Sequence, residues 1–265
     1  MNTLVVVLCS LLAALLFMTF MFFIARAKGR YDLIDVAWGL TFIGIALVSY
    51  AGQVSLQILS VQTLVTALVI IWGIRLSWHI YARWSRTRGE DKRYAAMRTQ
   101  YKKKLGGVDG TMYVRVFVVQ ALLALVISAP VLVVNTSEPL ALTWLSLTGA
   151  LVWGMGFFFE AVGDYQLKSY LASQPKKPPL MTTGLWKYTR HPNYFGEVTQ
   201  WWGIFVIATM APLGLIALVG PLVITILILF VSGVPLTEKH FEGRPGWAAY
   251  KRRTSSFLPL PPKKV

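Results

Sequence analysis

The sequence predicts an all-α integral membrane protein, a bundle of seven transmembrane helices formed by one domain over residues 1–265. Of the 265 residues 55% are hydrophobic and 14% charged, whereas a soluble domain carries roughly 25% charged residues. The mean hydropathy is +0.57, and the apolar residues gather in runs of about 20, the length that a helix needs to cross a bilayer. A disordered basic chain would lack this apolar content.

Seven segments are expected to span the membrane. They cover residues 3–25, 33–51, 56–81, 113–134, 140–165, 196–211 and 214–233. The first is expected to remain in the mature protein, because its basic residues follow the apolar run instead of preceding it as in a secretory signal. The four residues 211–214, with Pro212 among them, predict a tight hairpin between the last two spans. The tail, residues 234–265, is expected to end in a poorly ordered segment over 259–265.

The basic residues predict the orientation of the bundle. The 26 Lys and Arg against 11 Asp and Glu give a net charge of +15. When the loops are assigned alternately to the two sides, every basic residue falls on the side of the tail. By the positive-inside rule this side is cytoplasmic, which places the N-terminus outside and the C-terminus in the cytoplasm.

Topology accounts for part of this charge but not for the nine cations between Arg83 and Lys104. Anionic lipid head groups or an anionic ligand would account for them, and nucleic acid is not expected, because the chain has no recognisable nucleic-acid motif. The single cysteine, Cys9, excludes an intramolecular disulfide and a Cys-based zinc site. No metal site is predicted.

Ionisable residues within the expected spans indicate a functional site, because burying them in lipid is costly. Asp35 lies one turn into the second span, Arg75 and His79 lie near the end of the third, and Glu160 and Asp164 lie at the end of the fifth. Each pair is four residues apart and so shares a helix face. Any one of them could form a salt bridge between helices, such as Arg75 with Asp35. Together, at the basic side, they predict a water-accessible pocket.

The segment with the most polar signals runs from Leu180 to Trp202, LMTTGLWKYTRHPNYFGEVTQWW. Pro192 disfavours helix at the preceding residue, so Arg190 and His191 are expected in an extended turn before the sixth span. Backbone amides at the start of that span would bind anions. The chain has no Rossmann fingerprint and no Walker motif, so any nucleotide would be held without a Rossmann domain.

Several strings resemble one known family. These are YDLIDVAWG (31–39), IWGIRLSWHIYARW (71–84) with RGEDKRY (88–94), EAVGDYQL (160–167), GLWKYTRHPNYFGE (184–197) and GVPLTEKHFEGRPGWAAYKRRTSSFLP (233–259). They resemble the steroid 5-alpha-reductase family, in its bacterial DUF1295-type branch. The shorter RHPNYxGE core also occurs in sterol reductases and in isoprenylcysteine and phospholipid methyltransferases, which bind S-adenosylmethionine.

The resemblance implies an NADPH-dependent reductase that transfers a hydride to the beta-carbon of an enone, typically a 3-oxo-delta-4 steroid. The residues that it implies for cofactor binding are Arg93, Glu160, Asp164, Lys168, Arg190, His191, Asn193, Tyr194, Glu197, His240, Arg244 and Tyr250. At the position of Glu160 the eukaryotic enzymes have an Asn. The family polarises the ketone with a Glu and a Tyr, for which the nearest equivalents are Asp35 and Tyr81. Trp38 and Trp78 are the candidates to line a substrate cavity, although both are equally suited to anchor the chain at the membrane interface.

The sequence leaves two other functions open. A methyltransferase that uses S-adenosylmethionine would share the motif of the sixth span, and a lipid-binding or transport protein would need no cofactor. For the reductase, Asp35 would have to be protonated to stabilise the developing enolate. The expected partners are a steroid or related enone lipid and membrane lipids, with no obligate protein partner evident. The expected location is the inner membrane of a bacterium, with the cofactor site facing the cytoplasm.

Overall fold

A computed structural model describes residues 2–52, 59–102, 104, 106–173 and 180–264. Within these ranges the regular structure is helical, and the β contact described is an isolated parallel bridge between Thr189 and Ser255. The prediction of an all-α protein is therefore confirmed. The chain forms two compact units: unit 1 comprises Met1–Thr143 and Ala208–Val219, and unit 2 comprises Trp144–Ile207 and Gly220–Val265.

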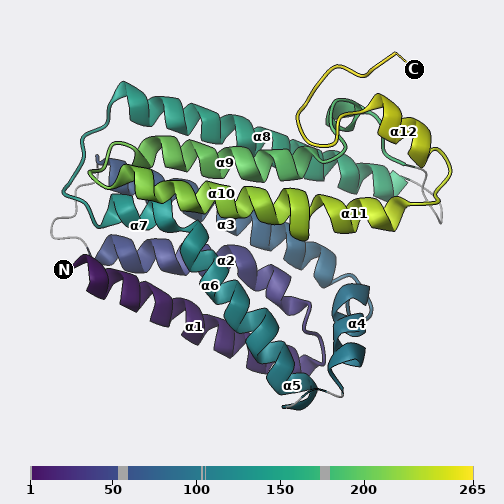
Figure 1. Cartoon of the computed structure of the whole chain (residues 1–265), viewed down its shortest axis with the longest axis horizontal. Helices are drawn as coiled ribbons and strands as arrows, with labels where there is room; N and C mark the ends of the chain where they lie inside the picture. The colour runs from purple at the N-terminus through teal and green to yellow at the C-terminus, as the bar shows by residue number, and fades with distance from the viewer. Residues whose placement is uncertain (1, 53–58, 103, 105, 174–179, 265) are drawn as a thin grey trace. The chain divides into compact units, whose positions relative to one another are not determined.

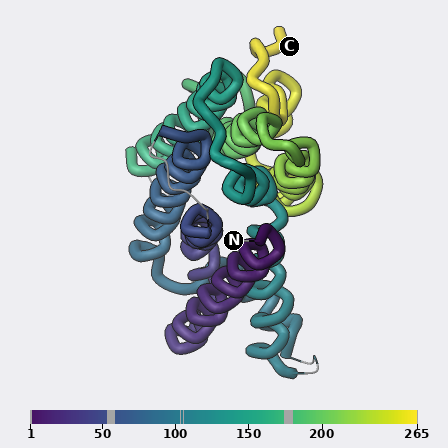
Figure 2. The backbone as a smooth tube through the Cα atoms, turned by 90° about the vertical axis from the view of Figure 1, so that its left-hand side faces the viewer, coloured from purple at the N-terminus to yellow at the C-terminus, as the bar shows by residue number. Residues whose placement is uncertain are grey.

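Unit 1 is built around its first three long helices. Its elements are α1 (Thr3–Lys28), α2 (Leu33–Ala51), α3 (Val61–Trp84), α4 (Lys92–Tyr101), α5 (Gly107–Met112), the π-helical η1 (Tyr113–Val118), α6 (Val119–Ile127), α7 (Ala129–Asn135) and the 3-10 helix η3 (Gly214–Leu218). Helix α2 packs against both α1 and α3, and α6 packs against α1 (Figures 1 and 2). This arrangement brings the C-terminal ends of α1 and α3 and the short α4 to one end of the unit.

Glycine and a buried amide fix the packing inside unit 1. A Cβ atom on Gly39 of α2 would lie 2.6 Å from the carbonyl oxygen of Gly73 on α3, so these helices approach closely only because both residues are glycine. The Asn135 side chain at the end of α7 donates to Ser49 Oγ at 2.9 Å and to Thr66 Oγ1 at 3.2 Å. Because unpaired amides are costly inside a membrane protein, these bonds hold α7 against α2 and α3.

Unit 2 carries the motifs of the second half of the chain. Its elements are α8 (Trp144–Ser173), the 3-10 helix η2 (Gly184–Lys187), α9 (Pro192–Ala208), α10 (Val219–Ile226), the π-helical η4 (Leu227–Val231), α11 (Val234–Phe241) and α12 (Trp247–Arg253). Helices α8 and α9 lie side by side (Figure 1). Helix α9 begins at Pro192 and not at the expected residue 196, because proline fits the first turn of a helix; His191 lies outside the helix, as the sequence predicts.

Glycines spaced by seven residues line the contact between α8 and α9. On α8 these are Gly149, Gly156 and Gly163, and on α9 they are Gly196 and Gly203. A Cβ atom on Gly156 would lie 2.6 Å from the carbonyl oxygen of Gly196, and one on Gly203 would lie 2.7 Å from that of Gly149. The two backbones therefore touch along several turns, which fixes the polar side chains between them in register.

Six helical segments are long and apolar enough to cross a membrane: Thr3–Lys28, Leu33–Ala51, Val61–Trp84, Gly107–Ile127, Trp144–Ser173 and Gly214–Phe241. The length and composition of these helices therefore indicate a multi-pass membrane protein. The expected span without a counterpart among these six is the sixth, 196–211, which corresponds to α9; its 17 residues are at the lower limit for crossing a bilayer. The number seven and the orientation of the termini remain predictions.

Several expected boundaries are wrong for local reasons. The third helix begins at Val61 and not at residue 56, because the extended Ser60 caps it by accepting from Thr63 N at 3.3 Å; residues 56–58 lie outside the described ranges. The fourth segment breaks at Ser128, because Pro130 has no N–H and its ring clashes with the preceding turn. The last segment remains helical beyond 233, with a bend at Ser232 and Gly233, and ends at Phe241.

The end of the chain is also more ordered than its composition predicts. Leu260 N donates to the Tyr188 carbonyl at 3.1 Å, and Lys263 N donates to the Arg253 carbonyl at 2.9 Å. The expectation of a poorly ordered end over 259–265 is therefore wrong for the residues up to 264. These backbone bonds hold the proline-rich segment, although prolines themselves donate none.

Candidate functional site

A row of carboxyl and amide groups lies on the contact between α8 and α9. Asn193 Nδ2 in the first turn of α9 donates to Asp164 Oδ1 at 3.2 Å. One turn further along the interface, Gln200 Nε2 donates to Glu160 Oε2 at 2.5 Å. Asp164 is 8% exposed and Glu160 2% exposed. The row therefore offers fixed donors and acceptors in a place shielded from water, where each bond is worth more than at a surface.

The approach of the two helices brings Asp164 to Asn193. A Cβ atom on Gly163 would lie 3.1 Å from the ring of Pro192. The motifs EAVGDYQL and RHPNYFGE thus meet at a glycine and a proline, and their polar residues follow directly. The geometry brings Asp164 into contact with Asn193 and places Glu160 one turn before Asp164 on α8, whereas their role in binding a cofactor stays a prediction.

Arg190 lies in a buried hub that joins the turn before α9 to α11, α12 and the tail. Its Nε and Nη2 atoms donate to Glu238 Oε1 at 2.9 and 2.6 Å, and Nη1 donates to the carbonyl of Lys251 at 3.1 Å and also to that of Thr254. Arg190 is 7% exposed. With its guanidinium bonded in these directions, Arg190 acts here as a structural cation, and a contact with a cofactor phosphate would require the hub to open.

The tail folds back over the 3-10 turn η2, as the sequence predicts for Tyr250. Tyr250 Oη donates to the Trp186 carbonyl at 2.6 Å, and burial raises the pKa of this phenol, so it remains a donor. Thr189 Oγ1 donates to the Phe257 carbonyl at 2.8 Å. Tyr250 therefore stabilises the turn that leads to α9.

His191 and Tyr194 lie at the edge of the same hub. His191 is 2% exposed, and its ring stacks on that of Tyr194 with centroids 5.3 Å apart. Its Nε2 atom lies 3.4 Å from Glu238 Oε1. Tyr194 Oη is 3.1 Å from Thr237 Oγ1. Both residues thus connect the start of α9 to α11.

The other residues of the predicted cofactor set in unit 2 are more accessible. Glu197 is half-buried in α9, one turn after Asn193, and Lys168 is exposed on α8. His240 and Arg244 are exposed and bonded to each other, with Nε2 and Nη2 atoms 2.9 Å apart. The geometry brings these two together, but it does not place them among the contacts of the α8–α9 row.

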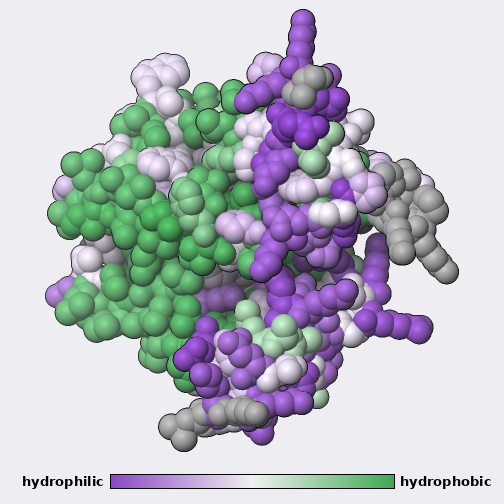
Figure 3. All heavy atoms as spheres, turned by 45° about the vertical axis from the view of Figure 1, so that its right-hand side comes forward, coloured by the Kyte–Doolittle hydropathy of each residue, from purple (hydrophilic) through white to green (hydrophobic). Residues whose placement is uncertain are grey.

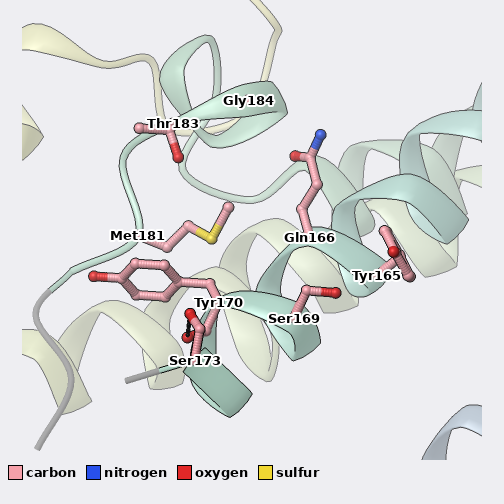
Figure 4. A pocket seen from close by; sticks show the side chains of 8 residues that line it. All are labelled: Tyr165, Gln166, Ser169, Tyr170, Ser173, Met181, Thr183 and Gly184. Atoms are coloured by element: carbon pink, nitrogen blue, oxygen red, sulfur yellow. Dashed lines mark hydrogen bonds between the residues drawn. The ribbon is translucent and has the colours of Figure 1, made fainter. Parts of the chain in front are cut away.

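A hollow of about 490 Å³ lies between the C-terminal half of α8 and the segment that leads into η2 (Figure 4). Its lining residues are Tyr165, Gln166, Ser169, Tyr170, Ser173, Met181, Thr183 and Gly184. The volume falls within the roughly 300–1,000 Å³ of small-molecule sites. Gln166 Oε1 accepts from Leu185 N at 2.9 Å, which leaves the amide nitrogen of Gln166 as a donor.

The chemistry of the hollow suits a flat ring that carries hydrogen-bonding groups. Aromatic rings, a thioether, hydroxyls and an amide line it, with no charged side chain among the lining residues. Tyrosine rings stack on planar ligands, and the hydroxyls and the amide can read the ligand's polar edge. Tyr165 follows Asp164 in α8, but successive residues of a helix point about 100° apart, so the hollow and the α8–α9 row lie on different faces of the same half of this helix.

A second polar cluster lies in unit 1, around Asp35. Tyr94 Oη on α4 donates to Asp35 Oδ1 at 2.5 Å, and Arg93 Nη2 bonds Oδ2 at 3.0 Å. Burial, and then the charge of Asp35, raise the pKa of the Tyr94 phenol well above its usual value. The described partners of Asp35 are thus Tyr94 and Arg93, both from α4. Both oxygens of Asp35 accept bonds, so in this arrangement the group with a proton to donate is Tyr94.

The other residues predicted for catalysis and substrate binding lie apart from this cluster. Tyr81 and Trp78 are 44% and 68% exposed, and their rings lie 6.1 Å apart on α3. Trp38 is half-buried, with its ring edge-on to that of Phe42 at 4.9 Å. Within unit 1 the structure brings Asp35 and Arg93 together, and it does not bring Tyr81 to Asp35.

Sequence reasoning missed three residues that carry these contacts: Tyr94, Gln200 and Glu238. Tyr94 lies on α4, 59 residues from Asp35 along the chain, so no helical spacing connects them. Gln200 does follow Asn193 and Glu197 along α9, and this spacing could have indicated a shared face. Glu238 lies within the matched tail string, but its partner Arg190 is 48 residues away.

The helices and the polar contacts define the class of the chain: a multi-pass, all-helical membrane protein with a polar row and a hollow in unit 2. A model of the family described as "Protein of unknown function (DUF1295)" matches residues 21–254, and the chain belongs to this family. A search of the curated proteins and a search of the solved structures each found no match.

Proposed function

We propose that the chain is an NADPH-dependent reductase of enone lipids, of the steroid 5-alpha-reductase type. The observation that supports this best is the pairing of Asp164 with Asn193 where the strings EAVGDYQL and RHPNYFGE meet, on the same half of α8 as the 490 Å³ hollow. A dinucleotide carries planar rings and hydroxyls, which the tyrosines, hydroxyls and amides of these places can bind, and its charged phosphates need cations. When bound, NADPH would supply the hydride, and the protein would orient it and stabilise the developing enolate.

The residues present fit such a cofactor. Tyr170 and Met181 offer faces for an aromatic ring, and Ser169 and Thr183 offer hydroxyls. Lys168, and Lys187 in η2, are exposed cations close to these residues along the chain and could neutralise phosphates. Asp164, Asn193 and Glu197 would bind the amide and hydroxyl groups of the cofactor. The hub of Arg190 would hold the start of α9, so that Asn193 keeps its position.

For the carbonyl, the proposal keeps Asp35 and replaces Tyr81 by Tyr94 as its phenol partner. A phenol that donates to a carboxylate can pass its proton to an enolate oxygen and be resupplied through the carboxylate. The proposed substrate is a 3-oxo-delta-4 steroid or a related enone lipid. The proposed location is the inner membrane of a bacterium, with the cofactor site facing the cytoplasm, because all the basic loops fall on that side by the sequence.

Binding and turnover test the proposal with the purified full-length chain in detergent. Isothermal titration with NADPH is expected to show binding, and NADPH is expected to be consumed only when the steroid is added. Mass spectrometry should show a product heavier by two hydrogens. Asn193→Ala is expected to weaken NADPH by about tenfold, the value of one charge-assisted bond, whereas the exposed Glu242→Gln should bind as the wild type does.

The runner-up is a membrane methyltransferase that uses S-adenosylmethionine. The hollow is compatible with it, because an adenosine ring would meet the same tyrosines and hydroxyls. The two functions differ in the second titration: tight binding of S-adenosylmethionine without binding of NADPH would refute the reductase.

A further inference from the structure

The end of unit 1 formed by α4 and the last turns of α1 and α3 separates its charges. Every acidic side chain of this end bonds an inner arginine. The pairs are Asp109 with Arg26 at 2.7 Å, Asp32 with Arg30 at 2.9 Å, Asp35 and Asp91 with Arg93 at 3.0 and 3.1 Å, and Glu90 with Arg98 at 3.2 Å. These ion pairs tie the loop after α3 to the ends of α1 and α2. In these pairs the arginines neutralise the acidic side chains of this end.

A second set of cations is left outside these pairs. Five of them, Lys28, Arg86, Arg88, Lys92 and Lys102, are here named the outer cations. All of them are exposed, and within the described part of the chain none forms an ion pair. Hydrophilic residues gather on the face that comes forward in Figure 3, and hydrophobic ones cover the surface beside it. The surplus charge of this end is therefore concentrated in residues that face solvent.

The outward face of α3 leads from apolar to aromatic residues toward these cations. Ile71, Ile74, Trp78 and Tyr81 follow at helical spacing and are 49%, 56%, 68% and 44% exposed. The ring of Tyr81 stacks on that of Trp84 with centroids 6.2 Å apart. This order matches the depth profile of a membrane, in which aliphatic chains give way to the interface where Trp and Tyr gather, and then to charged head groups.

We propose that the outer cations bind the head groups of anionic phospholipids, with Trp78 and Tyr81 lying against the lipid at the interface. Topology alone does not require this arrangement, because the positive-inside rule counts the charges of a loop whether or not they are paired. Here the acids neutralise inner arginines, and the outer cations keep their full charge beside a lipid-facing aromatic face. Charge complementarity with phosphate then favours a lipid such as phosphatidylglycerol over zwitterionic phosphatidylcholine. This inference does not depend on the proposed reductase activity.

Native mass spectrometry of the full-length chain tests the proposal, with phosphatidylglycerol and phosphatidylcholine of the same acyl chains titrated in detergent. The wild type is expected to prefer phosphatidylglycerol, and added salt should reduce the preference, because exposed charges are screened. Removal of each cation is expected to lower the affinity for phosphatidylglycerol about fivefold, or about 1 kcal/mol. The triple variant Arg86→Gln, Arg88→Gln and Lys92→Gln should therefore lower this affinity about a hundredfold.

A matched triple variant controls for net charge. Lys239→Gln, Arg252→Gln and Lys264→Gln remove the same charge from exposed residues of unit 2 and should keep the preference. Equal affinity for the two lipids, or an equal loss in both triple variants, would overturn the proposal. The lipid is expected to stay bound when soluble pyrophosphate is added. Its displacement by pyrophosphate would also overturn the proposal, since the cations would then form a site for a soluble ligand. The single variant Arg88→Gln gives a fivefold test should the triple variant not fold.

Discussion

Truncation of Arg190 is expected to release the C-terminal tail from unit 2. The guanidinium bonds Glu238 through two nitrogens and the carbonyls of Lys251 and Thr254 through the third. Arg190→Ala would leave a carboxylate whose side chain is 13% exposed with Lys251 Nζ at 3.6 Å as its remaining cation. Breaking a buried pair costs about 3–5 kcal/mol, and since Lys251 remains, we expect the lower value, about 3 kcal/mol. That corresponds to a fall of roughly 6–12 °C in Tm.

Thermal unfolding and limited proteolysis measure this effect in detergent. Because unfolding of such proteins is often irreversible, wild type and variants are compared at one heating rate. Trypsin should cut after Lys251 and the two arginines that follow much faster in Arg190→Ala than in the wild type, whereas Arg190→Lys should lie between them, because an ammonium lacks the planar fork. The exposed Arg252→Ala serves as the control. An Arg190→Ala protein that keeps its Tm and its resistance to trypsin but loses NADPH would refute the structural role and restore Arg190 to the cofactor site.

Three further predictions concern packing, pH and turnover. Gly156→Ala should lower the free energy of unfolding by about 1–3 kcal/mol, because the new Cβ atom would meet the backbone of α9. Gly154→Ala, with open space around it, should change Tm little. Equal effects of the two substitutions would contradict the close helix contact. Burial raises the pKa of Asp91, but the hydrogen bonds and charge of Arg93 outweigh it and lower the pKa. The stability from Asp91 is therefore fully present above its ordinary pKa and is lost as pH falls through the lower folded value, so an acid titration should be flatter for Asp91→Asn, and an unchanged curve would refute the pairing. Asp35→Asn should reduce steroid turnover by at least about a hundredfold, measured as NADPH consumption; full turnover would remove Asp35 as the carboxylate that supports Tyr94.

The sequence predicted the helices well where their ends carry local signals. Pro192 marked the start of α9, and the second span, 33–51, agrees with α2 at both ends. The motifs around Asp164 and Asn193 marked both residues as site candidates, but only the structure shows that they contact each other. Boundaries failed where a cap or a proline competed with hydropathy, as at Ser60 and Pro130, because the apolar run continues through both residues.

The partners of the charged residues could not be predicted from the sequence. Arg190, predicted to bind a cofactor, is bonded by Glu238 and by tail carbonyls, and Asp35 accepts a hydrogen bond from Tyr94 of α4. These contacts join residues that are 48 and 59 positions apart. Helical periodicity relates only residues within a few turns, so it carries no information about such pairs.

Composition and hydropathy thus determined by themselves that the chain is helical and crosses a membrane several times, because these properties depend on the free energy of transferring whole segments into lipid. The tertiary structure decided which charges are neutralised and which remain available. It paired the inner arginines with every nearby acid, buried Arg190 in the tail hub, and left the outer cations exposed. That division depends on distances of a few ångströms between distant parts of the chain, since the attraction between two charges weakens with separation and with exposure to water.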